Sequence, residues 1–266
     1  MGFYALEDRG GSAPPSPFVL AETAAYAVVY KPPRMHSAPL AVNAGEGGTL
    51  FHWYAGYYPA ITALRGRKDG EGGLLHRLDY ETRGLVLFAK TQGALDALVL
   101  QQERGLFTKE YGALCEKGSP PEGFPPAPEP GPPPFTLESA FRPFGPGRRE
   151  VRPAAFPPPK RQRKAAALDR GGPYITEVLE KLPLGEGVYF RLGIRRGFRH
   201  QIRCHLAWLG FPILNDGLYG GQTRGEGFLA LKAQGLAFYD PLTGEKRRYG
   251  IETLAHEVYD KAYGYE

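Results

Sequence analysis

The segment HRLDYETRG, residues 76–84, holds the residues best suited to catalysis. It runs directly into LVLFA, residues 85–89, a continuous apolar stretch that is typical of a fully buried strand. We therefore expect residues 76–84 to form a loop against the core, where catalytic groups usually sit. Asp79 is the candidate catalytic group of this loop. Aspartate is also common in turns, so a purely structural role stays open.

A second candidate segment is RRGFRHQIRCH, residues 195–205. Its pattern predicts a helix over residues 198–209, ended by Gly210. On that helix Arg199 and Arg203 would lie one turn apart and share a face. Guanidinium groups presented in this way can hold a carboxylate or a phosphate at two points. A solvated basic helix face is the alternative.

A third segment, Lys109-Glu110-Tyr111, lies in an alternating stretch that predicts a strand. Lys109 and Tyr111 would then point to the same side. A tyrosine at a cleft can stack on a nucleic-acid base. A tyrosine in a strand is more often part of the core, and the pattern does not choose between the two.

Metal and disulfide chemistry find little support in the sequence. The chain has two cysteines, Cys115 and Cys204, which are too few for a disulfide framework or a four-thiolate zinc site. His200 and Cys204 would lie one helical turn apart, but two ligands do not make a zinc site. We expect no metal and no organic cofactor, and a reducing, cytoplasmic setting.

Positive charge is concentrated in one part of the chain. The net charge is +5, from 33 basic and 28 acidic residues. Residues 141–170 alone carry nine Lys and Arg against two acids. Such clusters are typical of phosphate binding, although a solvated basic loop would have the same composition.

The pattern of apolar residues predicts a mixture of strands and helices without a regular βαβ rhythm, which favours an α+β fold with a mixed, mostly antiparallel sheet. Strands are predicted at residues 27–30, 85–89, 107–115, 135–142, 188–194 and 228–238, the last interrupted near 234–235, and helices at 50–64, 92–104 and 198–209. Thr91 is the expected N-cap of the second helix and Gly105 its C′ residue.

The expected organisation has four parts. Residues 1–20 form a flexible N-terminal segment, and residues 21–118 the first part of a catalytic domain. Residues 119–170 hold Pro-rich, basic insertions, because 15 of the 26 prolines lie between Pro120 and Pro159. Residues 171–266 complete the domain. We find no secretory signal and no apolar run of 18 residues, so no membrane span is expected.

Five motifs in this order resemble the RluA-type pseudouridine synthase family. They read VVYKPPRMHS, HRLDYETRGLVLFAK, KEYGALCEKG, GFRHQIRCHLAWLGFPILNDGLYG and LAFYDPLTGE, and they extend from about residue 26 to residue 245. The resemblance implies a pseudouridine synthase fold, with helices flanking a central sheet and a catalytic cleft. It also implies an RNA-modifying enzyme that isomerises uridine to pseudouridine.

The resemblance also implies roles for individual residues. Asp79 is the expected nucleophile, Arg203 supplies the positive charge that keeps it ionised, and Tyr111 lies against the uracil ring. The residues expected to contact RNA are Lys31, His76, Arg77, Thr82, Arg199 and His200. The expected partner is ribosomal or transfer RNA, and the protein is expected to be a monomer.

The sequence departs from the family pattern at Arg83, where serine is usual, and at Lys232, where histidine is common. These changes bear on substrate choice more than on activity. The Lys31-Pro32 motif comes too early for the small N-terminal RNA-binding domain of many relatives. Part of that role is assigned by hypothesis to the basic residues 143–165.

Three other functions stay open on sequence alone. The first is an inactive RNA-binding protein of the same fold. The second is a glycosidase that uses Asp79 and Glu81 as paired carboxylates. The third is a basic scaffold module.

Overall fold

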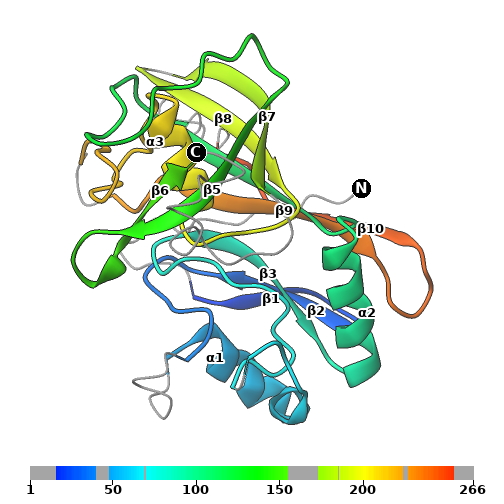
Figure 1. Ribbon diagram of the computed structural model, residues 1–266. Coiled ribbons are helices and arrows are strands. Elements are labelled where there is room, and N and C mark those ends of the chain that lie inside the picture. Colours follow the sequence, from blue (N-terminus) through cyan, green and yellow to red (C-terminus); the bar gives the residue numbers. More distant parts are fainter. Residues whose placement is uncertain are drawn as a thin grey trace, which may run out of the picture. The chain divides into compact units, whose positions relative to one another are not determined.

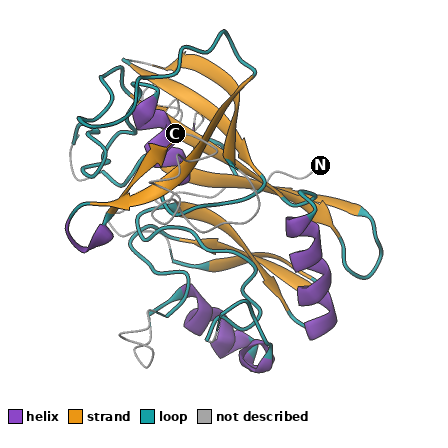
Figure 2. Cartoon of the chain, in the orientation of Figure 1, coloured by secondary structure: helices purple, strands orange, loops and turns teal. Residues whose placement is uncertain are grey.

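The computed structural model describes residues 16–39, 48–68, 70–154, 173–184, 186–223 and 227–254. The chain forms two compact units. Unit 1 comprises residues 1–109 and 232–253, and unit 2 comprises residues 110–231 and 254–266. Both combine strands with few helices, so the predicted α+β class is confirmed (Figure 1; Figure 2).

The sheet of unit 1 has the strand order β1-β2-β3-β9, with β10 paired to β9. The β3–β9 pair is parallel and the other pairs are antiparallel, so this sheet is mixed. Its elements are β1 (Phe18–Glu22), β2 (Tyr26–Lys31), α1 (Leu50–Tyr57), β3 (Arg83–Ala89), α2 (Gln92–Glu103), β9 (Leu231–Tyr239) and β10 (Lys246–Gly250).

The core of unit 1 lies between this sheet and α2. All six residues of β2 are buried, and so are the last six of β3, as the unbroken apolar run predicted. Leu95 and Leu98 of α2 pack against them. The predicted helix ends are confirmed, because the Thr91 hydroxyl accepts a hydrogen bond from Ala94 N and Gly105 has φ +68°.

Gly84 marks the point where the segment 76–84 joins β3. Its φ is +127°, a conformation that side chains rarely adopt. It pairs with Ala233 of β9, and a Cβ on Gly84 would lie 2.2 Å from Ala233 O. Only glycine therefore lets the two strands approach at the base of the Asp79 loop.

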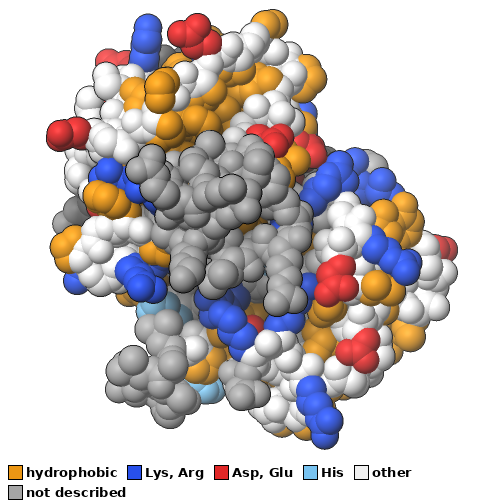
Figure 3. Space-filling view, viewed as in Figure 1, with side chains coloured by type: hydrophobic (Ala, Val, Ile, Leu, Met, Phe, Trp, Pro, Cys, Tyr) orange, Lys and Arg blue, Asp and Glu red, His pale blue; other side chains and the backbone are white. Residues whose placement is uncertain are grey.

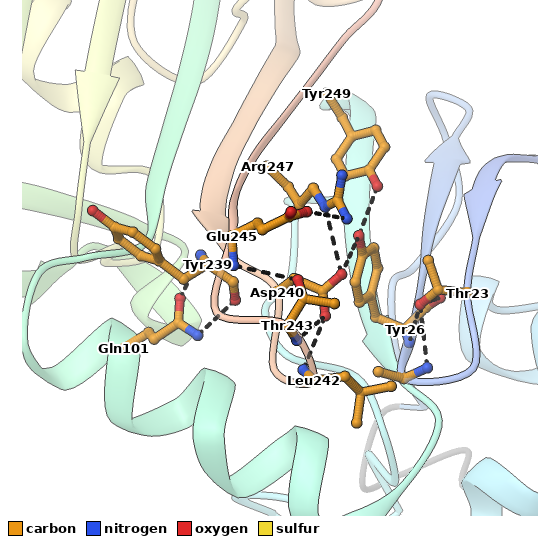
Figure 4. A network of polar contacts seen from close by, with 11 residues as sticks. Thr23, Tyr26, Gln101, Tyr239, Asp240, Leu242, Thr243, Glu245, Arg247 and Tyr249 are labelled. Atoms are coloured by element: carbon orange, nitrogen blue, oxygen red, sulfur yellow. Dashed lines mark hydrogen bonds and ion pairs between the residues drawn. The ribbon is translucent and has the colours of Figure 1, made fainter.

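Polar contacts hold the β9–β10 hairpin to the rest of unit 1 (Figure 4). The Asp240 carboxylate accepts hydrogen bonds from the backbone N–H groups of Leu242 and Thr243, which fixes the turn. The Gln101 amide of α2 donates to Tyr239 O and accepts from Tyr239 N, both at 2.8 Å. It thus pairs with the end of β9 as a neighbouring strand would.

The strand order in unit 2 is β4-β8-β7-β5-β6. Its elements are β4 (Thr108–Cys115), β5 (Phe135–Phe144), β6 (Glu150–Ala154), β7 (Tyr174–Leu184), β8 (Gly187–Ile194) and α3 (Gln201–Trp208). Hydrophobic side chains gather over β7 and β8 in Figure 3, and Ile175 and Leu182 of β7 are 41 % and 49 % exposed. Lys and Arg lie in several separate groups on the face drawn there.

Several elements differ from the sequence-based expectations. Strand β1 begins within the N-terminal segment expected to be flexible, whose residues 1–15 lie outside the described residues. The helix predicted over residues 50–64 ends at Tyr57, because Pro59 has no N–H to continue it, and residues 59–63 form a 3-10 turn. Strand β9 is continuous through Gln234 and Gly235.

The Pro-rich stretch contains part of a sheet. Strand β5 confirms the prediction for residues 135–142, and β6 pairs with it antiparallel from Ala140–Ala154 to Phe144–Glu150. Residues 150–154 therefore belong to the body of unit 2, whereas they were expected to extend from it. Residues 155–172 lie outside the described residues. Strands β7 and β10 were not predicted.

No helix among the described residues is long and apolar enough to cross a membrane.

Candidate functional site

The Asp79 loop is fixed by its own backbone and by the segment that follows β2. Asp79 is half-buried, and its carbonyl accepts a hydrogen bond from Thr82 N at 3.1 Å, which closes a turn. The Ser37 hydroxyl accepts from Leu78 N and donates to Leu78 O, both at 2.9 Å. Both the N–H and the carbonyl of the residue before Asp79 are thus hydrogen-bonded. This fixes the backbone that carries the Asp79 carboxylate.

Lys31 lies beneath this loop and is completely buried. Its Nζ donates to Pro32 O and Met35 O at 2.8 Å and to Tyr80 O at 3.2 Å. Burial lowers its pKa to about 7, and the Asp79 and Glu81 carboxylates oppose that shift.

Lys31 was predicted to contact RNA, and the structure places its side chain entirely in the interior. Three carbonyl acceptors match the three N–H bonds of an ammonium group. Lys31 ties the end of β2 to the backbone next to Asp79.

Two more residues predicted to contact RNA are enclosed. His76 is 8 % exposed, and its Nε2 accepts a hydrogen bond from Leu87 N at 3.3 Å. Burial, and then the charge of Lys109, hold the pKa of His76 well below its usual value, so the ring is neutral. Thr82 is 2 % exposed. Both side chains are enclosed within the loop, and their contact with RNA stays a prediction.

Arg77 is the exposed member of this group. Its Nη1 lies 3.1 Å from Glu71 Oε1, and half of the side chain is exposed to solvent. The Glu71 side chain is 12 % exposed, so the pair faces solvent on the arginine side only. The contact of Arg77 with RNA stays a prediction.

Tyr111 lies on β4 and is 5 % exposed. The alternation of β4 places Lys109, Tyr111 and Ala113 on one side, and all three are buried. Burial, and then the charge of Arg67, lower the pKa of Lys109 to about 8.

The segment before α3 differs from the prediction. The helix begins at Gln201, and His200 has the left-handed φ of +56°, so Arg199 lies in the turn before the helix. Arg199 and Arg203 therefore do not share a helix face. The Arg199 guanidinium donates through Nη2 to Arg148 O and to Glu150 O, the latter at 3.2 Å. It holds the turn between β5 and β6.

Arg203 is held by Asp216, a residue that sequence reasoning did not select. Arg203 Nε donates to Asp216 Oδ2 and Nη2 to Asp216 Oδ1, both at 2.7 Å. The Asp216 side chain is fully buried and that of Arg203 is 9 % exposed. Asp216 Oδ1 also accepts from Leu218 N and Tyr219 N, which fixes the carboxylate to its own turn. The guanidinium plane is therefore set by the fold.

Tyr219 extends this network to His200. The Tyr219 ring lies 5.3 Å from the Arg203 guanidinium carbon, and its hydroxyl lies 3.2 Å from His200 Nδ1. Burial, and then the charges of Arg203 and Arg199, lower the pKa of His200 to about 3. The ring is neutral at neutral pH, so it can donate or accept a hydrogen bond but adds no charge for a phosphate.

The predicted residues thus fall into two groups. Unit 1 brings Asp79 together with Lys31, His76 and Thr82 around one loop, and unit 2 brings His200 together with Arg203 around α3. Ser37, Asp216 and Tyr219 were missed as supports of these groups. Asp216 and Tyr219 lie in the motif NDGLYG, residues 215–220, which was the sequence signal that could have identified them.

The chain was compared with known protein families and proteins. Residues 25–208 match the RNA pseudouridylate synthase family. Ribosomal large subunit pseudouridine synthase D of Haemophilus ducreyi is 30 % identical over 223 residues, which is 77 % of this chain and 59 % of that protein. The Escherichia coli K12 protein of the same name is 28 % identical over 222 residues, 77 % and 59 % of the two chains.

An uncharacterized RNA pseudouridine synthase of Bacillus subtilis, YjbO, is 29 % identical over 177 residues, 66 % of this chain and 53 % of that one. The chain thus spans about half to three fifths of the length of these relatives.

Solved structures show the same fold at lower identity. Human RNA Pseudouridylate Synthase Domain Containing 4 has a TM-score of 0.58 at 17 % identity, covering 88 % of each chain. Human RNA Pseudouridylate Synthase Domain Containing 1 has a TM-score of 0.54 at 20 % identity, covering 89 % of this chain and 83 % of that one. The matched residues include the Asp79 loop, β4 and α3, and the chain belongs to the RNA pseudouridylate synthase family.

Proposed function

We propose that the protein is an RNA pseudouridine synthase, which isomerises uridine to pseudouridine within an RNA chain. The observation that carries the proposal is the family match across residues 25–208, which includes Asp79 on a loop held by Lys31 and Ser37. The reaction detaches uracil from its ribose, rotates the ring and rejoins it through carbon.

Asp79 is proposed as the nucleophile, or at least as the group that starts glycosidic cleavage. Its carboxylate stands on a loop whose backbone is hydrogen-bonded on both sides of it, so little reorganisation is needed for attack. The nearby Lys31 ammonium attracts the carboxylate. When Lys31 is protonated, its positive charge favours the ionised form of a nearby carboxylate, which a nucleophile requires.

Tyr111 and Arg203 are proposed as the other two catalytic residues, on the strength of the family resemblance. Tyr111 is assigned to the uracil face and Arg203 to the charge that keeps Asp79 ionised. Within unit 2 the guanidinium is held at two points by the buried Asp216 carboxylate.

The proposed substrate is a structured RNA, ribosomal or transfer. Turning a uridine out of its stack costs a few kcal/mol, and least where it is unpaired, so a loop uridine is favoured. Exposed arginines can offset that cost through phosphate contacts, and Arg77, Arg148 and Arg149 are the proposed ones. We further propose that the protein acts as a cytoplasmic monomer without a metal or organic cofactor.

The first prediction tests Asp79 directly. Replacing Asp79 with Asn should abolish pseudouridine formation and leave the RNA dissociation constant within about tenfold, roughly 1.4 kcal/mol, because the substitution removes a charge and little volume. Pseudouridine is measured after incubation with transcribed ribosomal and transfer RNAs. Asp96→Asn, an exposed change on α2, serves as the matched control and should retain full activity.

Three outcomes contradict the proposal in different ways. Normal turnover by the Asp79→Asn variant would remove the assigned nucleophile. RNA binding without any pseudouridine from the unaltered protein would favour an inactive RNA-binding protein. Release of free uracil would favour a glycosidase. Mapping pseudouridines in cellular RNA with and without the gene identifies the substrate position.

A further inference from the structure

A large aromatic ring stands exposed beside the proposed nucleophile. Tyr80 follows Asp79 directly and is 43 % exposed, although most tyrosines of the described core are nearly inaccessible. Aromatic faces at such positions are where bases of single-stranded RNA stack. Tyr80 and Asp79 belong to the same turn, and the Cα atoms of adjacent residues are about 3.8 Å apart.

The Tyr80 ring is supported from one side by His36. Their ring centroids are 4.7 Å apart, with the planes tilted by 40°. His36 is itself held in place, because its carbonyl accepts a hydrogen bond from Leu50 N at 2.9 Å and Ser37 is bonded to Leu78. The two rings thus form one small aromatic surface, the His36–Tyr80 pair, made by two segments 44 residues apart.

The backbone that carries Tyr80 is fixed. Its carbonyl accepts from the Lys31 ammonium at 3.2 Å, and Thr82 N donates to Asp79 O across the turn. A ring on a fixed backbone loses little conformational freedom when a ligand stacks on it, so most of the stacking energy is available for binding.

An arginine lies at the edge of this surface. Arg34 has a left-handed φ of +56°, and its Nε lies 3.7 Å from Glu81 Oε2 in an exposed ion pair. Both side chains of this pair are exposed, so the guanidinium is accessible to a phosphate from solvent. An aromatic ring combined with an exchangeable guanidinium is suited to a nucleotide: the ring takes the base and the arginine takes its phosphate.

We propose that the His36–Tyr80 pair stacks the base of a nucleotide directly adjacent to the target uridine, and that it thereby holds the RNA strand beside Asp79. The inference rests on the proposed function, because it assumes that Asp79 meets a uridine in RNA. Stacking is tolerant of base type, so this site favours the presence of a flanking base, purines most, over any one sequence.

The test combines protein variants with RNA changes. The probe is a fluorescein-labelled stem–loop RNA with one loop uridine, made intact and with an abasic residue on both sides of that uridine. Affinity is measured by fluorescence anisotropy in the Asp79→Asn background, so the reading does not depend on turnover. Turnover of the same RNAs by the unaltered protein is measured in parallel.

Tyr80→Leu should weaken binding of the intact RNA by roughly tenfold, a typical effect of removing one stacked base contact. The same change should have no effect on the abasic RNA. Tyr80→Phe retains the ring and should restore most of the affinity, whereas His36→Ala should lose part of it. Tyr57→Leu removes a ring that is 70 % exposed on α1 and serves as the matched control.

An equal effect of Tyr80→Leu on both RNAs, or no effect on the intact RNA, would overturn the inference. Thermal melting of each variant shows whether it is folded, and Tyr80→Phe keeps the comparison valid if leucine perturbs the loop. If the unaltered protein forms no pseudouridine but Tyr80→Leu still weakens only the intact RNA, the stacking site stands and the proposed reaction fails.

Discussion

Asp216 and Arg203 form a buried ion pair joined by two hydrogen bonds. Both hydrogen bonds are 2.7 Å long and the Asp216 side chain is fully enclosed. We predict that Asp216→Ala lowers the free energy of unfolding by about 3–5 kcal/mol, because it removes the buried carboxylate that accepts two hydrogen bonds from the guanidinium. Urea titration followed by far-ultraviolet circular dichroism measures the loss.

Asp216→Asn is the matched control. Its side chain can still accept from Leu218 N and Tyr219 N, so the turn is retained and the loss should be smaller than with alanine. A loss below about 1 kcal/mol for Asp216→Ala would show that water or another group compensates the guanidinium.

At the scale of single residues, the sequence predicted the position of a side chain better than its contacts. Asp79 was placed correctly on a loop before a buried strand. Lys31 was assigned to RNA through the family resemblance of its motif, and its side-chain nitrogen is surrounded by three backbone carbonyls. Asp216 could not be found by spacing, because its partner lies 13 residues away across a loop that only the fold brings back to α3.

The turn between β5 and β6 makes a prediction at the scale of an element. Arg148 and Arg149 are exposed at this turn, and Arg199 holds the backbone beneath them. If both contact phosphates, the double change to Gln should flatten the slope of log affinity against log salt by about 1.4–1.8. This change leaves β6 in place, whereas deleting residues 143–165 would remove a strand of the sheet.

The measurement is the dissociation constant for transcribed RNA at several salt concentrations between about 50 and 200 mM. Over this range the logarithm of the affinity falls with a slope proportional to the number of phosphate contacts. Arg104→Gln, an exposed change at the end of α2, is the control and should leave the slope unchanged. An unchanged slope in the double variant would exclude this turn from the RNA contact.

Elements with a strong local signal were predicted well. Strands β2 and β3 followed from unbroken apolar runs, and α2 from a capping threonine and a closing glycine. The start of α3 was misplaced because Phe198 N is bonded by the side chain of Gln201, a contact that ends the turn before the helix begins. Pro-rich composition hid β6, whose place in the sheet depends on its pairing with β5.

For the molecule as a whole, buried neutral histidines make stability depend on pH. His205 is fully buried between Ser139 and Thr176, and burial lowers its pKa to about 3. The unfolded chain binds a proton near pH 6.5 and the folded chain does not, so stability is full above that pH and falls as the pH decreases toward 3. At pH 5 the loss should be about 2 kcal/mol for His205 alone.

Guanidinium chloride titrations at pH 7.5 and pH 5 test this dependence. His205→Gln cannot take up a proton and can still bond to Ser139 and Thr176. The difference between the two pH values should therefore shrink by about 2 kcal/mol in this variant. An identical difference in both proteins would show that other groups control the acid sensitivity.

The close approach of β9 at Gly84 has a consequence for how this protein tolerates variation. A side chain at position 84 would need space already taken by Ala233 O, so every substitution there disturbs folding next to the Asp79 loop. A mutational scan scored only by pseudouridine yield would rank Gly84 beside Asp79, although glycine performs no chemistry. Scoring the cellular abundance of each variant separates the two positions. Gly84 variants should lose both abundance and pseudouridine yield, whereas Asp79→Asn should lose only the yield.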